Sequence, residues 1–373
     1  MKIPEIVPDD PAGVDGAELL DRAHAAFRRY CVLPSVEAGH AVTLWVAATH
    51  ALPALPAAPR LVITSAVKRS GKTRLLDIVE SLSYRPLVAA NATTAAVFRS
   101  LAAEHPPTLL LDEVDTIFGS PRVAEQNEDL RGLLNAGFQR GKPSLRCVGP
   151  QQSVTAFPTF AMAALAGIGG VPDTIADRAV NVRLNRRKTG ETVAPFRERR
   201  DRPPLEGIAA DLTAWLGAAE VRAALEAAVP EETGLEDRAA DCWEPLIMVA
   251  DAAGGHWPQH GRNAAKKLTD DQAEDDTETE AVRLLHDVEY VMEHAEDALR
   301  ADFIPSALLL ERLHRIEESG WREDGLTTRG LADKLATFGI RSKRDRAGKV
   351  RGYYRALFAD PFARYPTPGR EDP

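Results

Sequence analysis

Apolar and polar positions follow two distinct patterns along the chain. Short, continuously apolar runs occur at residues 61–64, 86–90, 108–112, 145–148, 161–167 and 179–184, and helix-patterned segments separate them. Such runs are typical of parallel strands that are buried on both faces, because the crossover helices cover both sides of the sheet. The pattern predicts an α/β domain, a parallel sheet flanked by helices, that ends near Arg187.

Helical periodicity dominates on either side of this domain. Residues 17–52 form two helical patterns separated at Pro34, and residues 205–267 are again helical. The acidic tract 270–280 interrupts the second region, and its like charges predict a solvated linker or an exposed helix start. We therefore expect an N-terminal helical region (1–58), the α/β core (59–190), a helical lid region (191–269), an acidic linker or helix (270–302) and a basic C-terminal unit (303–373).

Composition narrows the class of protein. The chain has 373 residues, of which 44% are apolar, and a formal net charge of −9. This balance argues against a wholly basic nucleic-acid coat but allows a local basic patch. The three cysteines are far apart, with neither metal-ligand nor disulfide-framework spacing, which fits a reducing cytoplasm. Because the sequence contains neither a membrane-spanning apolar run nor a signal-peptide core, we expect a cytoplasmic protein without a membrane partner.

The segment SAVKRSGKTRLLDIVE (residues 65–80) follows the first apolar run and ends its loop in Gly71, Lys72 and Thr73. In a phosphate-binding loop the backbone N–H groups surround the phosphates, the lysine contacts the β and γ oxygens, and the threonine hydroxyl holds Mg²⁺. Ala66 occupies the usual place of the first glycine, and alanine is the smallest replacement. The alternative is a turn that happens to contain GKT. The candidate nucleotide-binding residues are Ala66, Val67, Lys68, Arg69, Ser70, Gly71, Lys72, Thr73 and Arg74.

An acidic pair follows a later apolar run, in PTLLLDEVD. Ligands of parallel sheets bind beyond the carboxyl ends of the strands, where Asp112 and Glu113 are expected. Asp112 would join Thr73 in the Mg²⁺ shell, and Glu113 would orient and deprotonate the attacking water. The alternative is a pair of ordinary turn or helix N-terminal charges.

Arg178 stands directly before the last apolar run, in VPDTIADRAVNVRL. An arginine there can reach a neighbouring subunit and stabilise charge on its γ-phosphate, which requires a homo-oligomer. The alternative is a surface arginine at a helix C-terminus. Three basic residues further back, Arg140, Lys142 and Arg146, would face a central channel, the nucleotide or only solvent.

The C-terminal unit concentrates positive charge between residues 341 and 355, where Asp345 is the only acidic residue. Two predicted helices precede this stretch, the second opened by Thr327 or Thr328, so the unit resembles a winged helix-turn-helix. Tyr353 and Tyr354 would either stack on a base or fill the core of the unit. The candidate DNA-binding residues are Arg341, Lys343, Arg344, Arg346, Lys349, Arg351 and Arg355. The histidines show no metal or triad spacing, and we predict structural or surface roles for His40, His50, His256, His260 and His314.

Taken together, the GKT loop, LLLDEVD, NEDLRGLLNAG and PDTIADRAVNVRL resemble the AAA+ and superfamily-three-like NTPases, whose finger arginine precedes the fifth strand. More narrowly, LWVAATHAL, ITSAVKRSGKTRLLDIVE, EDRAADCWEPLIMVAD and RGYYRALFADPFARY look like domain-of-unknown-function family 3631, over about residues 40 to 365. That family occurs with phage, plasmid and integrated-element replication proteins, often beside or fused to primase modules. Its members often lack the glycine that Ala66 replaces.

The resemblance implies a P-loop ATPase that uses ATP and Mg²⁺. It also implies sensor residues, but AMAALAGIGG offers no polar residue for the first sensor, and Arg238 in EDRAADCWEP is a candidate for the second. We expect an oligomeric, helicase-like motor or loader in mobile-element DNA replication, with DNA and a primase or polymerase as partners. The alternatives are a nucleotide-switched assembly or defence ATPase that does not move on DNA, and a DNA-binding regulator with a degenerate nucleotide site.

Overall fold

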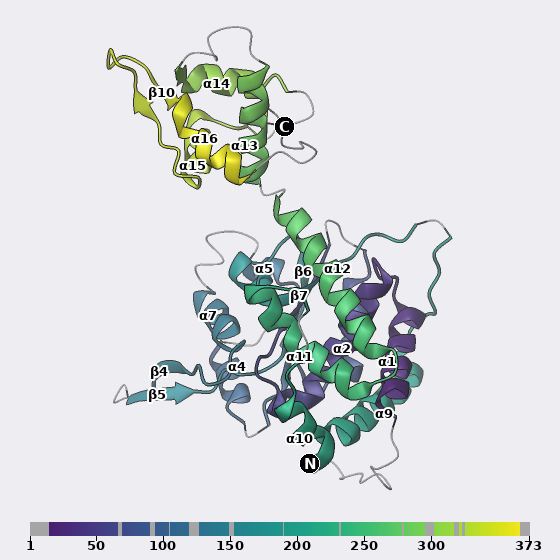
Figure 1. Cartoon of the computed structure of the whole chain (residues 1–373). Helices are drawn as coiled ribbons and strands as arrows, with labels where there is room; N and C mark the ends of the chain where they lie inside the picture. The colour runs from purple at the N-terminus through teal and green to yellow at the C-terminus, as the bar shows by residue number, and fades with distance from the viewer. Residues whose placement is uncertain are drawn as a thin grey trace. The chain divides into compact units, whose positions relative to one another are not determined.

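The computed structural model divides the chain into two units, Met1–Asp270 (unit 1) and Asp271–Pro373 (unit 2) (Figure 1). Among the residues it describes, none of the helices combines the length and apolarity that crossing a bilayer requires. The structure describes residues 15–65, 69–89, 94–103, 105–118, 127–148, 153–188, 190–230, 233–277, 280–294, 302–316, 321–322 and 325–365.

Unit 1 is built on a five-stranded parallel sheet with the strand order β2-β3-β6-β1-β7. The predicted parallel α/β core is therefore confirmed, and β6 separates β1 from β3. The strands are β1 (Arg60–Ser65), β2 (Pro86–Val88), β3 (Thr108–Leu111), β6 (Ala163–Ile168) and β7 (Ala179–Arg183).

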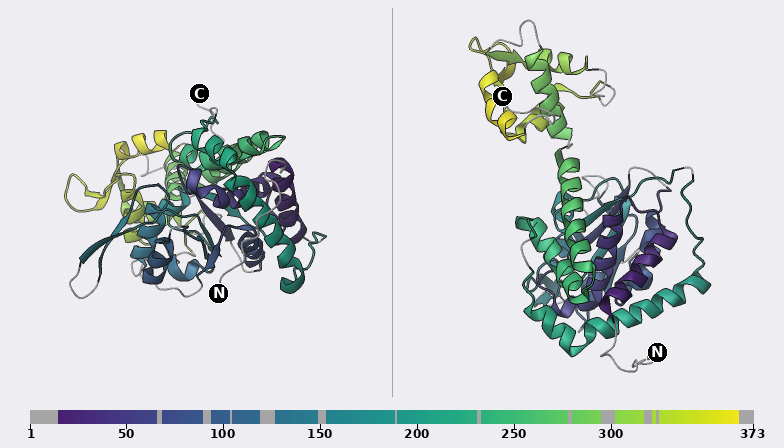
Figure 2. Two further views of the ribbon diagram at one scale, coloured as in Figure 1. Left: turned by 90° about the horizontal axis from the view of Figure 1, so that it is seen from below. Right: turned by 45° about the vertical axis from the view of Figure 1, so that its right-hand side comes forward.

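Helices cover both faces of this sheet, as Figure 2 shows. Successive residues of β1 point to opposite faces: Leu61 and Ile63 enter a larger core, and Val62 enters a smaller one. This is why the strands read as continuous apolar runs. The larger core includes α1 (Gly16–Tyr30), α2 (Val36–Ala51), α3 (Lys72–Leu82), α9 (Glu198–Gly217) and α11 (Asp237–Ala253), and the smaller core includes α4 (Thr94–Leu101), α5 (Asp115–Phe118), α7 (Glu128–Ala136) and α8 (Asp173–Ala176).

The two predicted N-terminal helices are α1 and α2, and each begins at a side-chain cap. Asp15 accepts hydrogen bonds from the backbone of Ala17 and Glu18, and Ser35 accepts one from Ala38. Every residue of α2 from Ala38 to Ala51 is buried, because α2 packs between β7 and the helices α1, α9 and α11.

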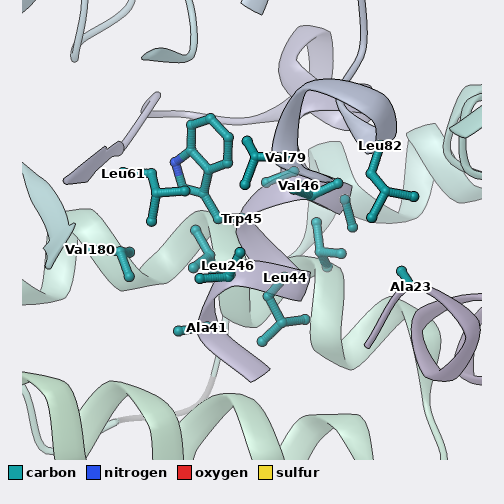
Figure 3. Close-up of a cluster of buried hydrophobic side chains, with 14 of the residues drawn as sticks. Ala23, Ala41, Leu44, Trp45, Val46, Leu61, Val79, Leu82, Val180 and Leu246 are labelled. Carbon is teal, nitrogen blue, oxygen red and sulfur yellow. The ribbon is translucent and has the colours of Figure 1, made fainter. Parts of the chain in front are cut away.

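Trp45 of α2 lies in the middle of the larger core, near Leu61, Val79 and Val180 (Figure 3). Its indole N–H donates to the Pro59 carbonyl at 2.8 Å, directly before β1. The N-terminal helices are therefore part of the sheet's core and help to fix where β1 begins.

The apolar run 145–148 does not join the parallel sheet, which corrects the expectation. It forms β4 (Ser144–Val148), which pairs antiparallel with β5 (Ser153–Phe157) in a hairpin that projects from unit 1 (Figure 1). The two runs are only four residues apart, so local antiparallel pairing is available without a crossover. Leu145 and Val154 lie on one face of the hairpin and are 66% and 69% exposed.

The acidic tract does not end the preceding helix at residue 270, which is a second correction. Helix α12 (Trp257–Thr277) continues through most of the tract, because Asp and Glu lower helix propensity only modestly. A new helix, α13 (Glu280–Glu293), then begins and belongs to unit 2. Helix α10 (Ala219–Ala227) connects α9 to the segment before α11.

Unit 2 has its own core and a three-stranded antiparallel sheet with the order β8-β10-β9. Thr327 caps α15 by accepting a hydrogen bond from Gly330, as one of the two predicted caps. Tyr353 is fully buried, so it fills the core rather than stacking on a base. The elements are α13, β8 (Phe303–Pro305), α14 (Ser306–Leu313), α15 (Thr328–Ala336), β9 (Lys343–Arg344), β10 (Arg351–Tyr354) and α16 (Ala359–Arg364).

Two histidines of α2 are buried in unit 1. The ring of His40 stacks on His260 of α12, with 4.0 Å between centroids. His50 Nε2 lies 2.8 Å from the Leu82 carbonyl, and Nδ1 lies 2.8 Å from Thr213 Oγ1. Burial lowers the pKa of both His40 and His50 to about 4. These two positions are structural, as predicted for them.

This burial predicts that acid destabilises unit 1. Below pH 6.5 an unfolded histidine binds a proton that folded His50 does not bind until about pH 4, so stability falls as the pH drops through this window. Between pH 7 and pH 5 each buried histidine should lower the free energy of unfolding by about 2 kcal/mol. Urea unfolding followed by tryptophan fluorescence measures this. His50→Gln should flatten the profile, and exposed His294→Gln should not; equal profiles for all three proteins would contradict the prediction.

Candidate active site

The predicted phosphate loop lies between β1 and α3, at the carboxyl end of β1. Ala66, Val67 and Lys68 lie outside the described residues. Arg69 and Gly71 have positive φ angles of 65° and 94°, and Gly71 directly precedes the first turn of α3. Because Gly71 is left-handed, glycine is the residue that this turn requires. The loop thus leads into a helix N-terminus, where free backbone N–H groups favour an anion.

The Lys72 side chain is held over the end of β1. Its Nζ donates to Ser65 Oγ at 2.5 Å and lies 3.5 Å from Ser70 Oγ. Lys72 is half-buried and Thr73 is exposed. Arg74, another predicted loop residue, is held elsewhere: it pairs with Asp77 at 2.9 Å, and its guanidinium lies over the Phe196 ring. Arg74 therefore serves packing of α3 in this structure.

The acidic pair follows β3 directly and has a strained backbone. Glu113 has a φ of 56°, which is uncommon outside glycine, and its N–H donates to Asp112 Oδ1 at 2.8 Å. The Glu113 carbonyl accepts hydrogen bonds from the backbone and hydroxyl of Thr116, both at 2.8 Å. The Glu113 side chain is exposed and Asp112 is half-buried.

Hydrogen bonds connect the carboxyl ends of the three central strands. Gly169 N–H donates to the Ser65 carbonyl at 3.1 Å, and Val114 N–H donates to the Ala166 carbonyl at 2.9 Å. Asp115 was not predicted from the sequence, yet its Oδ1 accepts a hydrogen bond from Ile168 N–H at 3.0 Å. The sequence feature that could have indicated it is its position directly after Asp112, Glu113 and Val114.

The loop and the acidic pair therefore lie at the same edge of the sheet. In register, Leu111 at the end of β3 is level with Leu165 and Val62, so β1 runs three residues beyond β3. The turn after β3 continues along β6 to the same height, because Val114 binds Ala166 and Asp115 binds Ile168. Two strand spacings separate β3 from β1, about 10 Å between backbones. Lysine and carboxylate side chains can approach one ligand across that distance.

The oxygen donors at this edge suit Mg²⁺ better than a softer metal. Mg²⁺ usually takes one or two protein ligands and completes its shell with substrate phosphates and water. Thr73 carries a hydroxyl and Asp112 a carboxylate at this edge. In the described ranges, no group of three or more His, Cys, Asp or Glu residues is arranged to hold a metal ion by itself.

Arg178 lies at the other edge of the sheet. It directly precedes β7, and its carbonyl accepts a hydrogen bond from Arg60 N–H at the start of β1. Its guanidinium donates to the Thr174 carbonyl at 2.5 Å. The ends of β1 are about 17 Å apart, so Arg178 is too far from Lys72 to share a ligand within one subunit.

Arg238, the predicted second sensor, lies near Arg178 instead of near Lys72. Burial and then the positive charge of Arg238 lower the pKa of the Arg178 guanidinium. On the same helix, Cys242 Sγ lies 3.5 Å from the Asp177 carbonyl. Because α11 begins near Arg178, at the edge opposite Lys72, Arg238 lies away from its own subunit's loop, and a sensor role for it stays a prediction.

Two other arginines that sequence reasoning missed or left open are structural. Arg60 is 1% exposed, and it donates to the carbonyls of Leu134 and Ala161. Burial lowers the pKa of Arg60 to about 9. Arg140 donates to the carbonyls of Leu52, Pro53 and Leu55 and so holds the segment between α2 and β1 in place. It therefore faces neither a channel nor the nucleotide.

Most of the predicted DNA-binding residues lie on the β9–β10 hairpin and are exposed. Asp345 shapes the turn, accepting hydrogen bonds from Lys349 and Val350 N–H, and Gly348 has a φ of 72°. Arg355 differs: it is half-buried, and its guanidinium lies 3.4 Å from the Met292 carbonyl, so it supports unit 2. The exposed cations are Arg341, Lys343, Arg344, Arg346, Lys349 and Arg351.

Comparisons with known proteins cover the chain unevenly. A family described as "Protein of unknown function (DUF3631)" matches residues 183–365, so the match begins after the loop, the acidic pair and Arg178. This span is narrower than the expected resemblance. A solved structure described as the A form apo structure of NrS-1 C terminal region-CTR is 13% identical, with a TM-score of 0.40, and covers 90% of this chain and 75% of that one.

A curated relative extends the comparison at the level of sequence. It is the "Uncharacterized 28.9 kDa protein in xis 5'region" of Saccharopolyspora erythraea, which is 41% identical over 189 residues. Those residues are 49% of this chain and 68% of the relative. This homologue and the family match over residues 183–365 show that the chain belongs to the protein family of unknown function DUF3631.

Proposed function

We propose that unit 1 binds ATP with Mg²⁺ and hydrolyses it. The observation that carries the proposal is the shared edge: Gly71, Lys72 and Thr73 begin α3 where Asp112 and Glu113 leave β3. A lysine, a hydroxyl, a helix N-terminus and two carboxylates are the groups that phosphoryl transfer uses, because this chemistry depends on positioning and charge neutralisation.

Each side chain has a role that its position supports. Lys72 would contact the β and γ phosphate oxygens, exchanging its hydrogen bond to Ser65 for them. Thr73 and Asp112 would hold the magnesium ion, which supplies charge neutralisation at the phosphates. Glu113 would orient a water molecule and accept its proton as the water oxygen bonds to the γ-phosphorus and the bond to the leaving ADP oxygen breaks.

We further propose that hydrolysis takes place between subunits of a homo-oligomer. Arg178 lies at the edge opposite the loop, so it can contact a triphosphate only on a neighbouring copy. A guanidinium supplied by a neighbour stabilises the charge that develops on the transferred group. Arg238 lies beside it and adds to the positive charge of that surface.

The C-terminal unit supports coupling to DNA. Its element order, helix–strand–helix–helix–strand–strand, is that of a winged helix, and the β9–β10 hairpin corresponds to the wing. Exposed Lys349 and Arg351 on this hairpin suit phosphate backbones, in a protein whose formal net charge is −9. The helix α15 offers few base-reading side chains, which favours backbone binding.

The function we propose is an ATP-driven, helicase-like motor or loader in mobile-element DNA replication, working with a primase or polymerase. An assembly or defence ATPase that does not move on DNA is the second candidate, because the nucleotide site and the basic wing belong to different units. DNA-stimulated hydrolysis separates the two, since only a motor or loader requires it.

Hydrolysis should depend on Lys72 and Glu113. Lys72→Ala removes the phosphate contact and Glu113→Gln removes the base, so each should lower ATP turnover by at least about a hundredfold. Glu113→Gln should still bind ATP. Phosphate release with and without single-stranded and duplex DNA measures turnover, and solution mass in ATP reports assembly. Lys142→Ala and Glu128→Gln are matched surface controls, and intact turnover in either site variant would refute the assignment.

Arg178 should act on a neighbour. Arg178→Ala should bind ATP but hydrolyse it at least about a hundredfold more slowly. Mixing Arg178→Ala with Lys72→Ala should restore part of the activity, because a Lys72→Ala subunit can supply its Arg178 to an intact loop. Arg187→Ala, an exposed arginine beyond β7, serves as control. No recovery on mixing, at a concentration where both variants assemble, argues against action between subunits.

The wing should set DNA affinity. Lys349→Gln together with Arg351→Gln should weaken DNA binding and lower the slope of log affinity against log salt by about one per charge removed. Hydrolysis without DNA should be unchanged. Fluorescence anisotropy of labelled DNA at several salt concentrations tests this, with Arg364→Gln on α16 as the control. Equal salt slopes for the Lys349→Gln, Arg351→Gln protein and the unsubstituted protein would exclude the wing as the DNA contact.

A further inference from the structure

A pocket of about 230 Å³ lies at the foot of the β4–β5 hairpin. Helix α4 contributes three of its side chains, α7 contributes one, and the hairpin contributes the rest. The pocket is part of neither the phosphate loop nor the acidic edge. Its lining residues are Thr94, Phe98, Arg99, Asp129, Arg146, Cys147 and Phe157.

Arg146 is the central polar group of this pocket. Its guanidinium lies over the Phe98 ring, 4.7 Å from the centroid, and pairs with Asp129 at 2.8 Å. Its Nε is buried and has no hydrogen-bond partner among the residues that the structure describes. Buried donors are normally paired, so this N–H is available for an acceptor on a ligand. The flat guanidinium is already oriented by Phe98, which leaves its other face for stacking.

The remaining lining includes two aromatic rings and one charge of each sign. The rings of Phe98 and Phe157 are 6.0 Å apart and inclined by 62°. Phe98 is 4% exposed and Phe157 is half-buried, so Phe157 is the ring that a ligand can cover. Arg99 is exposed at the rim, and Asp129, 61% exposed, can accept a hydrogen bond.

We infer that this pocket binds one base of a single-stranded nucleic acid, with the adjoining phosphate near Arg99. Typical small-molecule pockets occupy roughly 300–1,000 Å³, so this one suits a single ring system rather than a whole cofactor. A base offers a flat face for Phe157 and Arg146, an acceptor for Arg146 Nε and, next to it, a donor for Asp129. All four bases combine these groups, so stacking predicts little sequence preference. The inference deepens the proposed coupling to DNA and rests on it.

Cys147 provides a probe beside the pocket. It is exposed and borders the pocket from the hairpin face opposite Arg146 and Phe157, because it pairs with Val154 whereas Arg146 pairs with Thr155. Cys31 and Cys242 are buried, and burial raises the pKa of both of those thiols to about 12. The full-length protein should react with a thiol reagent at Cys147, and Cys147→Ser should not react. A single-stranded oligonucleotide of about 15 nucleotides should slow this reaction at least about fivefold. Duplex DNA should not slow the reaction. A parallel measurement with a nucleoside monophosphate tests whether one base and its phosphate are enough.

Two variants test the contacts themselves. Phe157→Leu keeps an apolar side chain but removes the stacking face, and Arg99→Gln removes the rim charge. Each should weaken single-strand binding about five- to tenfold in a Lys349→Gln, Arg351→Gln background, and Arg222→Gln on α10 should have no effect. Normal affinity in both variants would overturn the pocket. Absence of ATP hydrolysis, with single-strand binding still weakened in both variants, would instead reject the proposed function and leave the pocket standing.

Discussion

The hydrogen bonds along the carboxyl edge of the sheet are the constraint on which the candidate site depends. Gly169 binds the end of β1, and the turn after β3 is bound to β6 through Val114 and Asp115. These bonds fix the positions of two turns that are about 40 residues apart in sequence. Without them, the positive φ of Glu113 would relax, since a non-glycine residue holds that conformation only where its surroundings impose it.

The opposite edge carries a different set of charges. Buried Arg60 joins the start of β1 to α7 and to the segment before β6, while Arg178 is bound to the same strand through its backbone. An unpaired guanidinium in the interior is costly, so three hydrogen bonds to carbonyls are what make Arg60 tolerable there. Within one subunit, the candidate phosphate loop and half-buried Arg178 therefore lie at separate edges of the sheet.

Much of this arrangement could be predicted from the sequence. Buried parallel strands read as continuous apolar runs, so β1, β3, β6 and β7 were found, together with the residues that follow β1 and β3. Residues 145–148 were predicted to be a parallel strand because they are as apolar as the buried strands. No crossover helix separates them from residues 153–157, so they form an antiparallel hairpin instead. The edge of the sheet at which Arg238 lies could not be predicted, because it depends on the direction in which α11 packs, which periodicity does not encode. The continuation of α12 was missed because like charges disfavour a helix only weakly when they face water.

Helix α7 joins the two edges physically. At its start, Asn127 Nδ2 donates to the Ile117 carbonyl of α5, the short helix that follows Glu113. At its end, Asn135 Nδ2 donates to Thr174 Oγ1 of α8. The backbone carbonyl of Thr174 in turn accepts a hydrogen bond from the Arg178 guanidinium. The same helix carries Asp129, the partner of Arg146 at the hairpin foot. Because close-packed elements shift as units rather than deform continuously, a rearrangement around the acidic pair cannot leave α7 in place without breaking one of these contacts. The carboxylates, Arg178 and the hairpin pocket are therefore linked through one short helix of the smaller core.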